Sequence, residues 1–352
     1  MTSLSVETYI SLLVPFDKEW RSYVVGIEAE LLGLQFDVGS KLSDLMDLST
    51  HTVEAHFFHV NGMEPDSYAP LGLSPEDVEQ RLRAVRAGAV LHLSGRAEVE
   101  IPEERSFEFS DGAVRVMDRR KLEAWYSQEF VRAMNGTCAT LALALNLARP
   151  GVFDVGPSFS TDGAFVESEA SIISNIPLTA KAAQESVWPK FTSIPIEKVW
   201  NWITEKDYVD SMGETGIGRA FNAYSRLFSR ASSSAENENL FWALMGLEAL
   251  FCDGTAGSMS QVVSRSQLLL GAHAPLKKAF ARAYGVRSAF IHGGRPFPGQ
   301  FFQSDGLETF EHFSQTTVDA LATTAQMLVG SLRELIVRDW HSLEFTTQLE
   351  GS

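Results

Sequence analysis

An arginine and a histidine five residues apart are the side chains in this sequence best suited to chemistry. Arg287 and His292 lie in the segment Tyr284–Gly294, which is otherwise mostly apolar and ends in two glycines. Histidine donates and accepts protons near neutral pH, and a guanidinium group can bind two phosphate oxygens at once. The pair could therefore perform acid–base catalysis at a phosphate group.

The spacing of the pair limits how its members can cooperate. At about 100° per residue, Arg287 and His292 lie about 140° apart around a helix, so they do not share a face. The long arginine side chain could bridge that angle, or a second subunit could supply one of the two groups. Ser288 does share a face with His292, at i and i+4, and could orient the imidazole.

Glu248 is the one charged residue in the segment Leu240–Phe251, which is otherwise apolar on every side. Such a helix is buried, and a carboxylate within it must be paired or change its pKa. We expect Glu248 to hold Arg287 or Arg265. The same residues allow a purely structural interpretation, in which Arg287 and Glu248 form a buried ion pair and His292 caps a helix.

The distribution of charge is uneven along this acidic chain. Its 352 residues carry a net charge of −16, which argues against non-specific coating of nucleic acid. The run Gly254–Ser304, however, contains six basic residues and no acidic one. It could bind a phosphate backbone, form a solvated face or contact the acidic first half. Besides Arg287, its basic residues are Arg265, Lys277, Lys278, Arg282 and Arg295.

The first half of the chain, residues 1–150, has the pattern of an α+β domain. Runs of β-branched and aromatic residues predict strands at Tyr9–Val14, Thr52–Val60, Ala89–Leu93 and Ala97–Ile101, and a hairpin of Phe107–Phe109 with Ala113–Val116. Helices are expected from Ser74 to Ala87 and over residues 119–149. Residues 151–194, rich in Gly, Ser, Thr and Pro, are either a connecting segment or irregular strands.

Residues 195–345 predict an all-α domain with the short breaks typical of an antiparallel helical bundle. Apolar residues at i, i+3 and i+4 predict helices over Ile196–Ile203, Gly218–Arg230, Glu236–Phe251, Ser258–Leu270, Pro275–His292 and Asp305–Trp340. The aromatic residues expected in its core are Trp200, Trp202, Phe221, Tyr224 and Phe228.

Three weaker motifs have simpler explanations than the chemistry they suggest. His51, His56 and His59 could hold zinc, but on a strand His56 and His59 point to opposite faces, so we expect no metal site. The glycine-rich segment Gly213–Arg219 lacks the lysine of a phosphate-binding loop and fits the start of a helix. Cys138 has no histidine nearby in sequence and fits a buried structural cysteine.

The composition points to a cytoplasmic protein. No apolar stretch is long enough to span a membrane, and the N-terminus has an acidic residue and no basic leader before its apolar residues. Two cysteines give no disulfide framework.

The helical half resembles the HEPN family, most closely its Apea-like branch. That branch has a buried glutamate helix followed by a helix of the form R-x4-H-G, which correspond here to Ala243–Phe251 and Arg287–Gly293. The resemblance covers about residues 195–340, under half of the chain. Many active members have Asn, Asp or His directly after the arginine, where this chain has Ser288.

The resemblance implies a metal-independent endoribonuclease without cofactors. Arg287 and His292 would be catalytic, with Ser288, Glu248 and Tyr284 as supporting residues and the other basic residues of the run binding RNA, possibly tRNA. HEPN ribonucleases typically form homodimers and often act as toxins or in antiphage defence. The N-terminal domain would then be a sensor that responds to a protein or ligand trigger. The alternative is a catalytically inactive HEPN module that binds RNA, a nucleotide or a protein partner.

Overall fold

The computed structural model divides the chain into two compact units. It describes residues 2–13, 30–31, 34, 36, 48–59, 89–108, 111–150, 154–161, 165–166, 188–209, 211–227, 235–254, 258–295 and 308–345. The first unit comprises Met1–Ala142 and Val155–Ser171, and the second comprises Leu143–Asp154 and Ile172–Ser352. Among the described residues more lie in helices than in strands, and none of these helices is long and apolar enough to cross a membrane.

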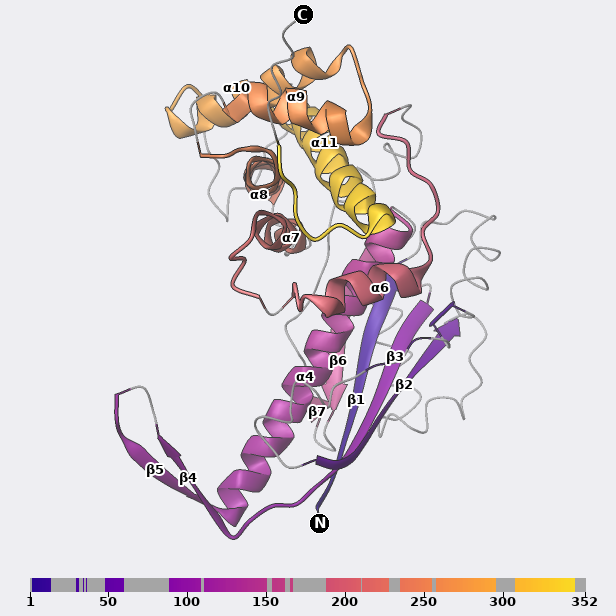
Figure 1. Cartoon of the computed structure of the whole chain (residues 1–352), viewed down its shortest axis with the longest axis vertical. Coiled ribbons are helices and arrows are strands. Elements are labelled where there is room, and N and C mark those ends of the chain that lie inside the picture. Colours follow the sequence, from indigo (N-terminus) through magenta and orange to yellow (C-terminus); the bar gives the residue numbers. More distant parts are fainter. Residues whose placement is uncertain are drawn as a thin grey trace, which may run out of the picture. The chain divides into compact units, whose positions relative to one another are not determined.

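A five-stranded sheet with the order β2-β3-β1-β6-β7 forms the centre of the first unit (Figure 1). Its strands are β1 (Thr2–Leu13), β2 (Leu48–His59), β3 (Ala89–Val99), β6 (Asp154–Thr161) and β7 (Phe165–Val166). β3 pairs antiparallel with both β1 and β2. The strands expected in 9–14 and 52–60 are confirmed and begin earlier than predicted. Two short strands also lie in the segment for which a connection and irregular strands had both been considered.

The prediction of two strands in 89–101 is wrong, because β3 runs through Gly95 without a break. Glycine usually weakens a strand or marks a close approach of another element. Here α4 (Arg119–Ala148) packs against the sheet, and a Cβ atom at Gly95 would lie 2.6 Å from Sδ of Met134 and 3.2 Å from Cζ of Phe130. Gly95 is therefore a packing position within the strand.

The other expectations for the first unit concern a hairpin and two helices. The hairpin is confirmed as β4 (Glu104–Glu108) paired antiparallel with β5 (Val114–Asp118). α4 confirms the helix expected over residues 119–149. The helix expected from Ser74 to Ala87 lies outside the described residues.

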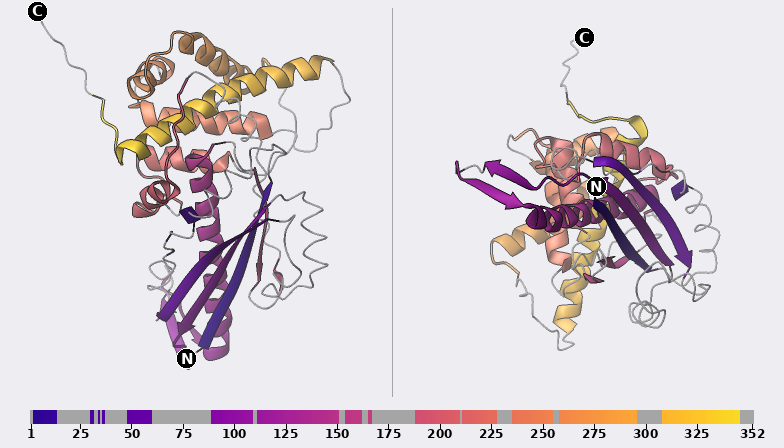
Figure 2. Two further views of the ribbon diagram at one scale, coloured as in Figure 1. Left: turned by 90° about the vertical axis from the view of Figure 1, so that its right-hand side faces the viewer. Right: turned by 90° about the horizontal axis from the view of Figure 1, so that it is seen from below.

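Six helices of the second unit match those predicted from periodicity, with ends shifted by a few residues. They are α6 (Ile196–Glu205), α7 (Gly216–Arg226), α8 (Ala235–Phe251), α9 (Ser258–Leu270), α10 (Leu276–Ile291) and α11 (Glu308–Arg338). α8 packs against α7 and α11, and α10 packs against α11. The left view of Figure 2 shows α11, in yellow, passing between the orange helices and the α7–α8 pair.

The core of this unit contains the aromatic residues that the sequence placed there. Trp200, Trp202, Phe221 and Tyr224 are all buried, whereas Phe228 lies outside the described residues. Tyr224 donates a hydrogen bond to the carbonyl of Leu143, in the last turns of α4. This contact helps to explain why the end of α4 belongs to the second unit, although the sequence had suggested a first domain of residues 1–150.

Two helical glycines should respond to alanine in opposite ways. A Cβ atom at Gly216 in α7 would lie 2.6 Å from the carbonyl oxygen of Ala249 in α8, which is backbone and cannot move aside easily. Gly285 in α10 is exposed and has no such neighbour within 4 Å among the described atoms. We expect Gly216→Ala to lower the free energy of unfolding by about 1–3 kcal/mol. Gly285→Ala should raise it by about 0.5–1 kcal/mol, because alanine favours helix.

Urea denaturation of both variants and the wild type measures the two effects. An equal stabilisation by both substitutions would contradict the close approach of α7 and α8.

Candidate functional site

Glu248 holds Arg287 at the contact between α8 and α10. The Nη1 atom of Arg287 lies 3.4 Å from Oε1 of Glu248, and the two side chains are 27% and 24% exposed. The pair is therefore partly open to solvent rather than sealed in the core. Of the two arginines that Glu248 was expected to hold, the structure selects Arg287.

Tyr284 ties this ion pair to a third helix. Its hydroxyl donates a hydrogen bond to Oε1 of Glu248 and lies 3.1 Å from the hydroxyl of Ser258, in the first turn of α9. The guanidinium of Arg287 lies over the Tyr284 ring, 5.4 Å from its centre. Because Glu248 and the ring both constrain it, Arg287 has a defined position at the edge of α10.

His292 ends α10 and is exposed. It is the C-cap residue, its backbone N–H bonds to the carbonyl of Ser288, and Gly293 follows with a φ of +73°. A glycine in this left-handed conformation commonly terminates a helix. The helix-capping role considered for His292 thus holds for its backbone, while its imidazole is exposed.

Ser288 is exposed on the same side of α10 as His292. Within the described part of the chain, neither side chain donates to or accepts a hydrogen bond from the other, so the orienting role expected of Ser288 is not seen. His292 also lies about 140° around the helix from Arg287. One copy of α10 therefore presents the two groups in different directions.

An exposed face of α10 carries His292 together with basic residues. Lys277, Lys278 and Arg282 are exposed, and at about 100° per residue Lys278 lies within about 40° of His292 around the helix. The exposed Gly285 occupies the middle of this face and adds no bulk. The cationic face, defined by Lys278, Arg282 and His292, is thus open to a large anionic ligand, and Lys277 lies at its edge, about 60° around the helix from His292.

Arg265 differs from these residues because its guanidinium is already engaged. It lies 2.9 Å from Asp253, donates to the carbonyl of Phe251 at 2.7 Å and to Gln261 at 3.0 Å, and is 19% exposed. These contacts stabilise the turn between α8 and α9. Arg295, the last of the candidate RNA-binding residues, is half-buried just after α10.

The structure bears differently on the three weaker motifs. The backbones of His51, His56 and His59 lie on β2, where His56 is opposite His92 of β3, but their side chains fall outside the described residues. Thr215 caps α7 by accepting a hydrogen bond from the N–H of Gly218, which confirms that the glycine-rich segment begins a helix. Cys138 is 2% exposed, and burial raises the pKa of its thiol, so it is a structural residue.

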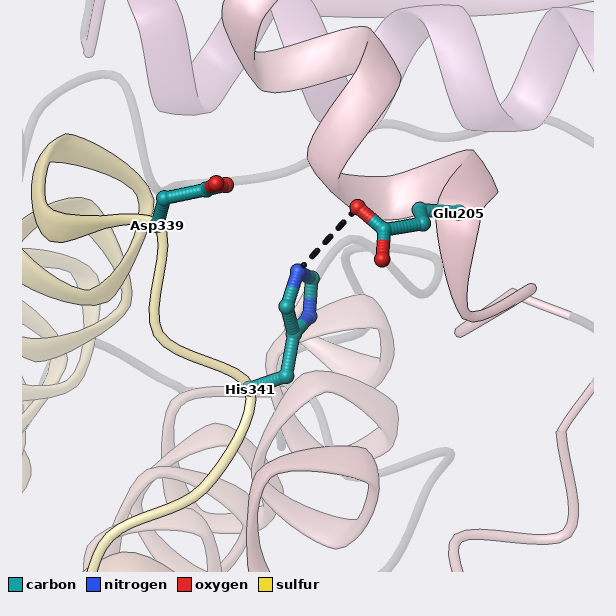
Figure 3. A group of neighbouring side chains, drawn as sticks. All are labelled: Glu205, Asp339 and His341. Carbon is teal, nitrogen blue, oxygen red and sulfur yellow. Dashed lines mark ion pairs between the residues drawn. The ribbon is translucent and has the colours of Figure 1, made fainter.

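A group of three potential metal ligands was not found from the sequence. Glu205 at the end of α6 and Asp339 and His341 just after α11 bring their ligand atoms within 4.8 Å of one another (Figure 3). The spacing Asp339-Trp340-His341 at a helix end was the available local signal. The third member lies more than a hundred residues away, so tertiary structure alone brings the three together.

No protein-family model matches the chain, and searches of curated proteins and of solved structures gave no match. The HEPN resemblance therefore stays a prediction from the segments Ala243–Phe251 and Arg287–Gly293.

Proposed function

We propose that this protein is a HEPN-type endoribonuclease that cleaves RNA without a metal ion. The observation that carries the proposal is the surface of α10, where the exposed His292 shares a face with Lys278 and Arg282. Lys277 lies at the edge of that face, and Glu248 holds Arg287 on another side of the helix. Such a surface can bind the phosphate backbone of RNA through its charges. His292 would then lie next to the basic side chains that bind the phosphodiester.

The reaction needs the two kinds of side chain that this site provides. The 2′-hydroxyl of a ribose attacks the adjacent phosphorus and passes its proton to a base. The bond from phosphorus to the 5′-oxygen breaks, and that oxygen takes up a proton as it leaves. The products are a 2′,3′-cyclic phosphate and a 5′-hydroxyl. His292 would transfer a proton, and Arg287 would stabilise the negative charge on the pentavalent phosphate.

A homodimer would overcome the angular separation of Arg287 and His292. Since α10 directs the two groups to different sides, a phosphate could contact Arg287 of one subunit and His292 of the other. The N-terminal unit would then act as the sensor. The setting would be a toxin or antiphage-defence system, in which HEPN proteins often act.

Mixing two inactive variants tests the shared site. We expect equimolar Arg287→Ala and His292→Ala proteins, exchanged by mild denaturation and refolding, to regain roughly a quarter of wild-type activity. Half of the random dimers are mixed, and each mixed dimer has one intact site if the two groups come from different subunits. No recovery, with subunit exchange verified by mass labels, would place both groups in one subunit.

Product analysis tests the activity itself. Purified protein incubated with labelled tRNA and total RNA in EDTA should produce 2′,3′-cyclic phosphate ends, detected by their resistance to phosphatase until acid opens the ring. Intact RNA after prolonged incubation, or cleavage that EDTA abolishes, would contradict the proposal.

The second candidate function is a binding module without catalysis. It is favoured by the engagement of Arg287 with Glu248 and Tyr284, which resembles a structural ion pair. RNA bound in a gel-shift assay but left uncut would support this candidate.

A further inference from the structure

In the second unit, three side chains from the ends of two helices lie close together (Figure 3). Glu205 approaches from the last turn of α6, and Asp339 and His341 from the segment that follows α11. The Nε2 atom of His341 lies 3.4 Å from Oε2 of Glu205. All three potential ligand atoms are within 4.8 Å of one another.

The way the two helices end determines this arrangement. Just after α6, the N–H of Tyr208 donates to the carbonyl of Ile203, and Asp207 has a φ of +47°. Just after α11, the N–H of Trp340 donates to the carbonyl of Leu335, and Asp339 has a φ of +57°. Both are Schellman motifs, in which glycine normally occupies the left-handed position.

The same motif therefore turns the chain sharply after each helix, so that Tyr208 and His341 come into contact. At both left-handed positions the sequence has an aspartate, which adopts this conformation at some energetic cost. At position 339 the aspartate places a carboxylate beside Glu205 and His341.

The His341 ring is fixed by its neighbours in a way that leaves one nitrogen available. Its Nδ1 atom lies 3.0 Å from the hydroxyl of Tyr208, and the ring stacks on Trp202 with the planes 14° apart. Its Nε2 atom is buried, and among the described residues it makes no well-aligned hydrogen bond beyond the 3.4 Å contact with Glu205. When Nδ1–H donates to Tyr208, the lone pair of Nε2 is directed at the two carboxylates. Histidines that bind metals commonly have such a hydrogen bond at the other nitrogen.

We propose that Glu205, Asp339 and His341 form a binding site for a divalent transition-metal ion of the Zn²⁺ class. One imidazole and two carboxylates suit such an ion better than Mg²⁺ or Ca²⁺, which prefer oxygen ligands throughout. Ligand bonds of about 2.0–2.2 Å require each donor to move by less than about 1 Å from its place here. Glu205 and Asp339 are exposed side chains that can make this adjustment.

Three protein ligands leave a coordination position for water or a further ligand. The site uses none of the residues proposed for RNA cleavage and does not depend on that function.

Metal titration of single-ligand variants tests the site. Tag-free, EDTA-stripped full-length protein should bind Zn²⁺ with a Kd below about 10 μM in isothermal titration calorimetry, and Zn²⁺ should raise its Tm. His341→Gln and Glu205→Gln should each weaken this binding by at least about tenfold. The matched control Glu197→Gln removes an exposed carboxylate from the first turn of α6 and should leave the affinity unchanged.

Loss of affinity in the two ligand variants but not in the control supports the site. Zn²⁺ binding that survives both ligand substitutions belongs elsewhere, for example to the N-terminal histidines, and overturns the proposal. An absence of Zn²⁺ binding also overturns it and leaves His341 and Glu205 as an ion pair.

The two left-handed aspartates supply a second test that does not risk unfolding. Asp339→Gly and Asp207→Gly both put glycine where the backbone favours it, so each should raise Tm by about 1–3 °C. Asp339→Gly should also weaken Zn²⁺ binding by at least about tenfold, whereas Asp207→Gly should retain it. Wild-type affinity in Asp339→Gly would overturn the assignment of Asp339 as a ligand.

Discussion

We expect Arg333→Met to lower the free energy of unfolding by about 3–5 kcal/mol. Arg333 lies in α11 and is 4% exposed. Its guanidinium donates to the carbonyls of Leu147 and Ala148 at the end of α4 and to the carbonyl of Thr192. Methionine would keep much of the volume but remove the donor to the carbonyls of Leu147 and Thr192, whereas the carbonyl of Ala148 would keep its hydrogen bond from Arg149.

The charge of Arg333 is retained at neutral pH. Burial and the nearby cation Arg149 lower the pKa of Arg333 to about 10, which still keeps the guanidinium protonated at pH 7. The face of the guanidinium also packs on Phe191, 5.1 Å from the ring centre. Arg333 therefore stabilises the end of α4 as a charged donor group, which methionine cannot replace.

Arg338→Met is the matched control for this prediction. Arg338 lies in the last turn of α11, is 40% exposed and pairs with Glu334 at i, i−4. Exposed pairs of this kind contribute little, so we expect a loss below about 1 kcal/mol. Urea denaturation followed by circular dichroism measures both variants. Similar small losses for the two would show that the Arg333 hydrogen bonds contribute little to stability.

The second large effect is expected in the RNA cleavage proposed above. His292→Ala should reduce the rate of RNA cleavage by about 10²–10⁴-fold, because water would have to replace the imidazole in the proton transfer. Arg287→Ala should reduce it by about 10²–10³-fold, the usual cost of removing a group that stabilises a developing negative charge. Single-turnover cleavage of a labelled RNA measures the chemical step apart from product release.

Lys277→Ala and Lys278→Ala are the controls for these variants. Each should weaken RNA binding and reduce the slope of log affinity against log salt by about one, with little change in the cleavage rate at saturation. His292→Ala protein that folds normally and still cleaves at the wild-type rate would exclude this histidine from the reaction.

The helices of the second unit were predictable because local signals agreed with tertiary packing. In α6 and α7 the apolar spacing marks the same residues that are buried, including Trp202 and Phe221. Glu248 was expected to need a partner because it interrupts an apolar helix, and Arg287 provides one. In these cases the sequence of a single helix was enough to make the prediction.

The features that sequence analysis missed depend on contacts between distant elements. Two strands were predicted where β3 is continuous, because the α4 side chains that fill the space at Gly95 cannot be inferred from the sequence of the strand. The choice between Arg265 and Arg287 as the partner of Glu248 depended on how α9 and α10 pack on α8. The convergence of Glu205 with His341 depends on two separate helix ends.

Gly216 and Gly285 should also differ in the substitutions that each position tolerates. At Gly216 any side chain would press on the carbonyl of Ala249, so selection for folding alone should disfavour every replacement. At Gly285 folding would accept most residues and would gain from many of them. A saturation-mutagenesis library sorted first for folding and then for RNA binding should therefore separate the two glycines. Gly216 should be intolerant in the first sort, and depletion at Gly285 should emerge in the second if nucleic acid approaches the helix closely there.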